Sequence, residues 1–180
     1  MKNLKDIIQE KLKVNSQTKI NQYEYYPKNK EELDKIIKKL IEERGQEANL
    51  NDISTSKITD MSELFELSHF NGDISQWDVS NVKTMKRMFI RSEFNGDISK
   101  WDVSRVKNMR EMFYCSKFNG DISNWDVSNV EDMDGMFAWS KFNCSNGDIS
   151  NWEPSKDVTT RNMFVGTPNQ KWKNTPKWLK

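Results

Sequence analysis

Few residues of this chain can take part in catalysis or metal binding. The sequence has one histidine and two cysteines among 180 residues. A structural zinc site needs four nitrogen or sulfur ligands, and an activated nucleophile needs a base beside it. His69, Cys115 and Cys144 are too few for either site, and no glycine-rich phosphate loop is present. We therefore expect no enzymatic activity, no metal and no cofactor, and two free thiols that suit a reducing compartment.

The sequence also lacks long hydrophobic runs. A helix that crosses a bilayer needs roughly 18–20 apolar residues, and no stretch approaches this length. Residues 1–19 carry a charge every few positions and contain no apolar run like that of a secretory signal. We therefore expect no membrane span. The location expected is cytoplasmic if the chain is complete, and the cell surface if a leader was removed.

A strong charge of either sign is absent from the chain as a whole, because the formal net charge is +1. The charge is nevertheless uneven, since residues 1–50 sum to +2, residues 51–140 to −5 and residues 141–180 to +4. An acidic body with a basic tail lacks the basic stripe of a nucleic-acid-binding domain. We expect no direct contact with nucleic acid.

What the chain has instead is a repeat rich in aromatic residues. Residues 70–93, 94–117 and 118–141 are identical at 15 of 24 positions. Weaker copies flank them at residues 51–69 and 142–165, the last with a three-residue insertion. A fixed period of this size indicates one supersecondary unit stacked on copies of itself, about five coils in this chain.

Within each coil, the spacing between apolar residues changes part-way along the sequence. Ile74, Trp77 and Val79 have the spacing of a leucine-rich-repeat strand. The apolar residues after them recur at helical spacing: Val82, Met85, Met88 and Phe89. The pattern predicts an α/β solenoid in which each coil holds a short strand and about two turns of helix. Because one coil cannot bury its own apolar side, the coils have to stack.

Helices are expected before the repeats. Residues 4–14 have the spacing of a short amphipathic helix. A second helix is predicted between an N-cap at Asn29 and a closing glycine at Gly45. Its apolar residues recur at i, i+3, i+4, i+7 and i+8: Leu33, Ile36, Ile37, Leu40 and Ile41.

These features predict one structural domain with three parts. Residues 1–50 form a helical N-terminal cap, residues 51–168 the repeats, and residues 169–180 a C-terminal capping tail. The tail alternates lysines with Trp172 and Trp178. We expect its tryptophans to cover the last coil, and the alternative is contact with acidic lipid or nucleic acid.

The sequence motif of the coil resembles the repeat of the BspA-like leucine-rich-repeat bacterial surface proteins; it reads FNGDIS–WDVSNV–M–MF. This class occurs in mycoplasma-type lipoproteins and in low-GC bacteria and their phages. The resemblance covers about residues 51–165. It implies a right-handed, leucine-rich-repeat-like solenoid of strand–helix coils that is used for binding, and anchoring at the surface in many members.

Two residue types recur at fixed places in every coil. Tryptophans form one column, which we interpret as core, with stacking of ligand rings as the alternative: Trp77, Trp101, Trp125 and Trp152. Acidic residues form two columns, one after the Asn-Gly turn and one beside the tryptophans. We expect the first of these to make Asx turns. The alternatives are a calcium ladder, or an acidic ribbon that meets a basic partner.

The candidate contact residues are those that vary between coils, together with the aspartates beside them. The strand-face group is Gln76, Asp78, Lys100, Asp102, Asn124 and Asp126. On the predicted outer helix face the charge runs from basic in two coils to acidic in the third. The basic group is Lys83, Lys86, Arg87, Lys107 and Arg110, and the acidic positions are Glu131, Asp132 and Asp134. A solvated face without a partner is the alternative.

The function expected from these features is a non-enzymatic protein–protein interaction module that is monomeric and presents its repeat surface to a protein partner. Two alternatives stay open. One is a phage or mobile-element inhibitor of a host nuclease or defence complex. The other is a surface adhesin that lacks its leader.

Overall fold

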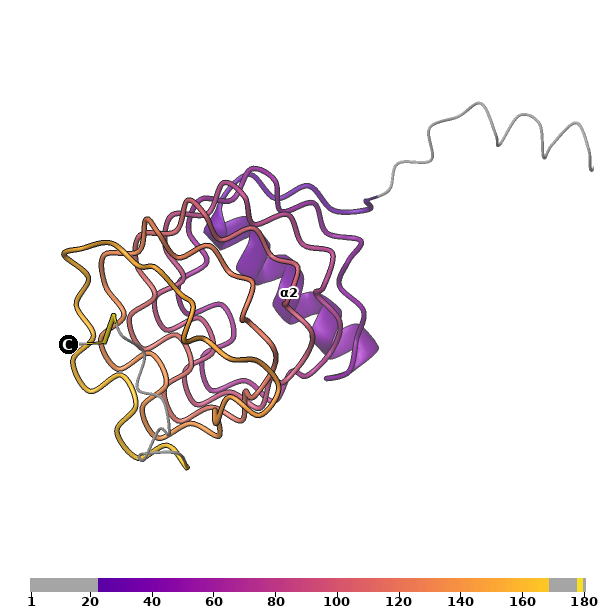
Figure 1. Cartoon of the computed structure of the whole chain (residues 1–180). Helices are drawn as coiled ribbons and strands as arrows, with labels where there is room; N and C mark the ends of the chain where they lie inside the picture. The colour runs from indigo at the N-terminus through magenta and orange to yellow at the C-terminus, as the bar shows by residue number, and fades with distance from the viewer. Residues whose placement is uncertain (1–22, 169–177, 180) are drawn as a thin grey trace, which may run out of the picture.

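The repeats form a stack of coils with a helix across one end (Figure 1). The structure is a computed structural model and describes residues 23–168, 178 and 179. The single α-helix of these residues is α2, Lys30–Arg44. No strand of regular length forms among them. Successive coils are instead joined by isolated parallel bridges, which pair Asp60 with Thr84, Thr84 with Asn108, Asn108 with Asp132, and Asp132 with Thr159.

Helix α2 begins and ends where its capping residues predict. The Asn29 side chain accepts a hydrogen bond from the backbone N–H of Glu32 at 2.9 Å. Gly45 has a φ of 89°, and its N–H donates to the Ile41 carbonyl at 2.8 Å. The inward face of the helix is fully buried in the core of the stack: Leu33, Ile37 and Leu40. The helix therefore covers the apolar end of the first coils.

The coils themselves are not strand–helix units, so the predicted α/β solenoid is wrong. Where a helix was predicted, the N–H groups of Met85 and Arg87 donate to carbonyls of the next coil, both at 2.9 Å. The N–H groups of Met88 and Ile90 donate three residues back. Arg87 and Arg91 have positive φ values of 58° and 52°, which a right-handed helix excludes. Residues 85–92 are a series of turns.

The predicted strand is also absent. The N–H of Trp77 donates to the carbonyl of Ile74, and the N–H of Val82 donates to that of Val79. Two tight turns therefore replace the strand of a leucine-rich repeat. Apolar spacing shows which side chains face inward, but it does not decide which carbonyl accepts each N–H. In this stack the neighbouring coil accepts many of them.

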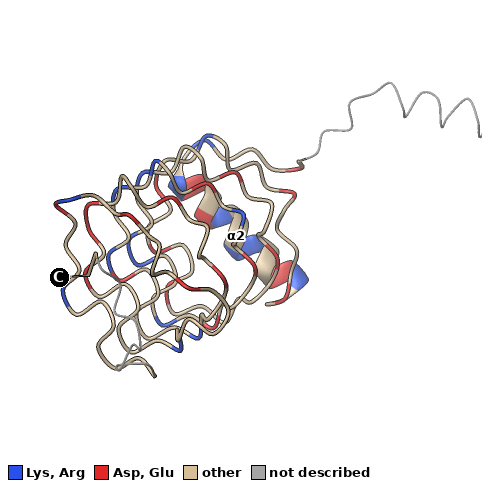
Figure 2. Cartoon of the chain, viewed as in Figure 1, with Lys and Arg blue, Asp and Glu red and all other residues tan. Residues whose placement is uncertain are grey.

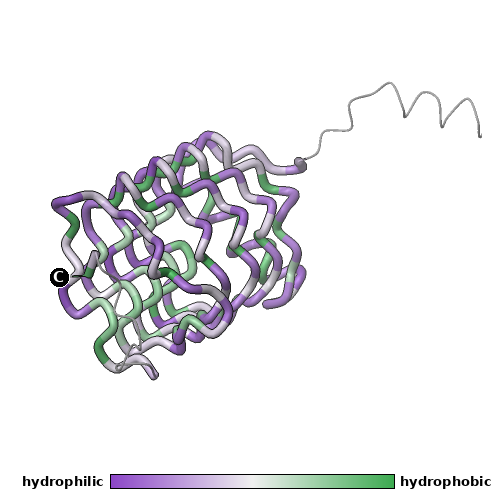
Figure 3. Tube along the Cα trace, viewed as in Figure 1, coloured by the Kyte–Doolittle hydropathy of each residue, from purple (hydrophilic) through white to green (hydrophobic). Residues whose placement is uncertain are grey.

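The core consists of stacked aromatic rings. The column tryptophans are only 3–4% exposed, which confirms that they belong to the core. Each indole N–H donates to a backbone carbonyl of the preceding coil, as from Trp125 to Ile98 at 3.1 Å. Phenylalanines form a second column with ring centroids 5.4–5.7 Å apart: Phe65, Phe89, Phe113, Phe137 and Phe164. Apolar and polar stretches accordingly alternate along every coil (Figure 3).

The tryptophan column continues past the last repeat. Trp178 stacks on Trp152 with 6.1 Å between ring centroids, and its indole N–H donates to the Ile149 carbonyl. Trp178 therefore covers the last coil, as the sequence predicts. Trp172 and the helix expected at residues 4–14 lie outside the described residues.

Candidate functional site

Two columns of acidic side chains run along the stack, and together we call them the acidic ribbon. One column is Asp73, Asp97, Asp121 and Asp148, and the other is Asp78, Asp102, Asp126 and Glu153. In the first column each carboxylate accepts the backbone N–H of the serine two residues later, at 2.8–2.9 Å. The expected Asx turns are therefore present.

Serines hold the three aspartates of the second column as well. Asp78 accepts both the N–H and the hydroxyl of Ser80, at 3.1 and 2.6 Å. Asp102 repeats this arrangement with Ser104. Asp126 accepts the N–H of Ser128 at 3.0 Å. Each aspartate is thus fixed by its own coil while its side chain stays exposed.

These hydrogen bonds favour the ionised carboxylates. The backbone N–H groups of Ser99 and Ser123 lower the pKa values of Asp97 and Asp121. The Ser128 hydroxyl, and then its N–H, lowers the pKa of Asp126. Burial works to raise the pKa of Asp73, but bonds from Ser75 and Asn51 outweigh it, and the pKa lies below the ordinary value. These four carboxylates stay charged at neutral pH.

The variable residues beside the tryptophan column lie within this ribbon. Gln76, Lys100 and Asn124 are all exposed, each next to a buried tryptophan. Lys100 is the one basic residue at these positions. The structure therefore brings together the whole predicted strand-face group, although on turns and not on strands.

A second surface, which we call the turn face, is formed by residues 85–92 and their copies at 61–68, 109–116, 133–140 and 160–167. Arg87 is its central cation. Its guanidinium lies 3.3 Å from Glu63, 3.1 Å from Glu66 and 3.5 Å from Glu111. Arg110 continues the network, with 3.6 Å to Glu111 and 3.5 Å to Asp134.

Basic residues predicted in one coil therefore form ion pairs with acidic residues of a neighbouring coil. Lys107 likewise lies 2.8 Å from Glu131 of the next coil. Lys83 and Lys86 are exposed and have no ion pair among the described residues. Basic and acidic segments are interspersed over the stack in Figure 2. Because Arg87, Lys107 and Arg110 are engaged within the protein, they are weaker candidates for partner contacts than the ribbon.

The turn face also contains a hollow of about 450 Å³ that the sequence did not predict, and we call it the Trp139 hollow. Its lining includes Arg110, Tyr114, Asp134, Gly135, Trp139 and Arg161. Trp139 is 59% exposed, unlike the column tryptophans. The signal available in the sequence was its position: the repeat has Arg91 and Cys115 at this place, not tryptophan.

One family model matches the chain, over residues 33–145 and again over residues 114–178. Its description is Mycoplasma protein of unknown function, DUF285. The chain belongs to the DUF285 family. This membership supports the likeness to a mycoplasma-type repeat but not to the BspA-like leucine-rich repeat. No curated protein and no solved structure matches the chain.

The DUF285 stack offers little for metal or thiol chemistry in the part that the structure describes. Over residues 23–168 and 178–179, no group of three or more His, Cys, Asp or Glu side chains is placed to hold a metal ion. Both cysteines are free, Cys115 being exposed and Cys144 half-buried. Burial raises the pKa of Cys144 to about 11. None of the described helices has the length and apolarity that a membrane span requires.

Proposed function

We propose that this DUF285 protein is a non-enzymatic binding module whose acidic ribbon docks on a basic surface of a partner protein. The observation that supports this most is the density of fixed like charge. Eight acidic residues and one lysine occupy the two ribbon columns and the positions between them over four coils. Neighbouring carboxylates of the first column repel one another, since Asp73 acts to raise the pKa of Asp97 and Asp97 that of Asp121, although the serine bonds outweigh this effect. A basic partner surface would relieve this repulsion.

The ribbon is also held in place before binding. The serine bonds fix the aspartate side chains, and the coils beneath them are locked by a buried aromatic core. A partner would therefore lose little affinity to ordering of these side chains. Long-range attraction between the ribbon and a basic patch would speed association.

The test starts with an affinity capture from lysate of the native host, followed by identification of the partner by mass spectrometry. Binding of the purified pair is then measured at low and high salt. The informative variant is Asp78→Asn/Asp102→Asn/Asp126→Asn, since asparagine keeps an oxygen acceptor for Ser80, Ser104 and Ser128. Its matched control is Lys83→Gln/Lys86→Gln, which removes exposed charges of the other sign.

The aspartate variant should bind at least tenfold more weakly and should lose much of its salt dependence. The lysine control should bind as well as the wild type or more tightly. Equal affinity of the aspartate variant and the wild type would refute docking through the ribbon.

A further inference from the structure

The Trp139 hollow exists because one column of side chains is interrupted. Glu63, Arg87 and Glu111 occupy this column in three successive coils, and Gly135 takes the next place. All four have positive φ values, from 53° to 64°. The backbone path is therefore unchanged at Gly135, and only the side chain is missing. The space left is the hollow of about 450 Å³, which is within the range of ligand-binding pockets.

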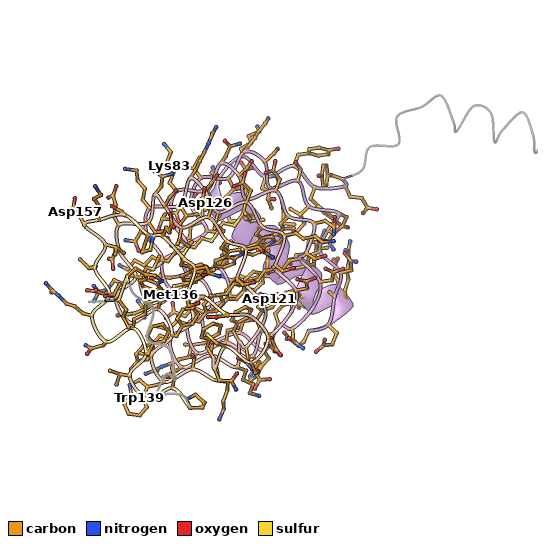
Figure 4. All side chains as sticks on the ribbon, viewed as in Figure 1. Lys83, Asp121, Asp126, Met136, Trp139 and Asp157 are labelled. Carbon is orange, nitrogen blue, oxygen red and sulfur yellow. The ribbon has the colours of Figure 1, made fainter. Side chains whose placement is uncertain are left out.

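A second glycine fixes the aromatic wall of the hollow. Gly166 lies one coil beyond Trp139, and a Cβ atom at Gly166 would come within 2.3 Å of the Trp139 ring. The indole therefore packs directly over the Gly166 backbone, while 59% of the residue stays exposed. Figure 4 shows Trp139 at the edge of the molecule, far from the ribbon residue Asp126. Such a fixed, exposed ring is a platform on which another ring can stack.

Of the four charged side chains that line the hollow, one has no ion-pair partner in the part of the chain that the structure describes. Asp134 accepts the backbone N–H of Arg161 at 2.8 Å and pairs with Arg110 at 3.5 Å. Glu111 is shared between Arg87 and Arg110. Both acidic residues of the lining therefore already have basic partners within the protein. The Arg161 side chain is exposed and has no ion pair among the described residues.

From this combination we propose that the Trp139 hollow binds an aromatic side chain flanked by a carboxylate in a peptide segment of a partner protein. The ring stacks on Trp139 in the space above Gly135, and the carboxylate pairs with Arg161. Arginine suits this role because its planar guanidinium can bind a carboxylate through two hydrogen bonds. The site is independent of the acidic ribbon, which would repel such a ligand.

The test uses the full chain labelled with 5-fluorotryptophan and followed by ¹⁹F NMR. The Trp139 resonance is assigned with Trp139→Phe, and the four buried tryptophans of the column report on the fold. The probe is the peptide acetyl-Glu-Phe-Glu-amide. Its matched controls are acetyl-Gln-Phe-Gln-amide, acetyl-Glu-Ala-Glu-amide and acetyl-Lys-Phe-Lys-amide.

Two variants test the two parts of the site. Arg161→Gln removes the free cation. Gly135→Asn refills the hollow, and asparagine fits because Asn162 occupies the same column with a φ of 56°. A Cβ at residue 135 would approach only the flexible Glu111 side chain, at 3.3 Å. Unchanged resonances of the buried tryptophans would show that each variant is folded.

The acidic aromatic probe should shift the Trp139 resonance in a saturable way and leave the buried tryptophans unmoved. We expect about threefold or greater weakening with either control that lacks the charge or the ring, and with either variant. The proposal is overturned if the probe leaves the Trp139 resonance unmoved up to its solubility limit. It is also overturned if the lysine peptide binds as well, which would indicate a cation-binding ring, or if both variants bind like the wild type.

Discussion

The acidic ribbon and the turn face belong to the same coils, yet they differ in the signs of their charged side chains and in the partners of these side chains. On the ribbon, carboxylates of equal sign lie in columns, and each aspartate is held by a serine of its own coil. On the turn face, charges of opposite sign alternate between coils and pair with one another. The ribbon therefore keeps its charge available to a partner, whereas the turn face uses most of its charge to join neighbouring coils.

The difference follows from which positions vary between coils. The ribbon aspartates and their serines belong to the invariant part of the repeat, so each stacked coil adds the same negative charges to the ribbon. Arg87, Glu111 and Gly135 share one variable position, so each coil can complement the next. A repeat protein can in this way have one surface with the same residues in every coil and another whose residues differ from coil to coil, both on one core.

The largest effect is expected from the core on which both surfaces depend. Trp125→Ala would remove a buried ring and leave the Ile98 carbonyl without its indole donor. We expect a loss of about 3–5 kcal/mol in the free energy of unfolding. Trp139→Ala is the matched control and should cost less than about 1 kcal/mol because the residue is mostly exposed. Urea unfolding measures both, and equal losses would contradict the assignment of Trp125 to the core.

A smaller effect is expected when the central cation of the turn face is removed. Arg87→Gln would leave Glu63, Glu66 and Glu111 without their shared partner. We expect a loss of about 1 kcal/mol at low ionic strength, because the group is only partly exposed, and a smaller loss at high salt. Lys86→Gln, its exposed neighbour, is the control and should change stability little. Urea unfolding at two salt concentrations measures this, and a loss that does not depend on salt would argue against an electrostatic network.

The cap and the core were predictable from sequence because each depends on local rules. Asn29 and Gly45 mark the ends of α2 through hydrogen bonds within a few residues of themselves. The buried tryptophan column follows from the repeat period together with inward apolar spacing. The conformation between the apolar positions was not predictable in this way. The N–H of Arg87 donates to a carbonyl 23 residues ahead, and a partner so distant leaves no local signature in the sequence.

The same distinction holds for the candidate sites. The turn that holds Asp97 involves a serine two residues away, and the Asn-Gly-Asp motif predicts it. The Trp139 hollow depends on two successive coils, because Gly135 and Trp139 belong to one coil and Gly166, on which the indole packs, belongs to the next. Each of these residues is unremarkable in its own coil. Only the stacked arrangement brings them together.

The smallest effect concerns acid stability and separates the ribbon from the turn face. The folded pKa values of Asp97, Asp121 and Asp126 lie below the ordinary aspartate value of 3.8. Their ionised forms therefore stabilise the fold fully above this value, and the contribution is lost as the pH falls through the folded pKa values. The urea midpoint of the wild type should accordingly fall as the pH is lowered from neutral to below 3.8.

The variant Asp97→Asn/Asp121→Asn/Asp126→Asn tests this origin directly. Asparagine keeps an acceptor oxygen for the serine N–H groups but does not titrate, so the variant should lose less stability on acidification than the wild type. Lys86→Gln on the turn face should keep the wild-type dependence on pH. If the triple variant lost stability as steeply as the wild type, the serine bonds would not be favouring ionised carboxylates. The carboxylates would still be ionised at neutral pH, but the serine bonds would not be what holds them in place before docking.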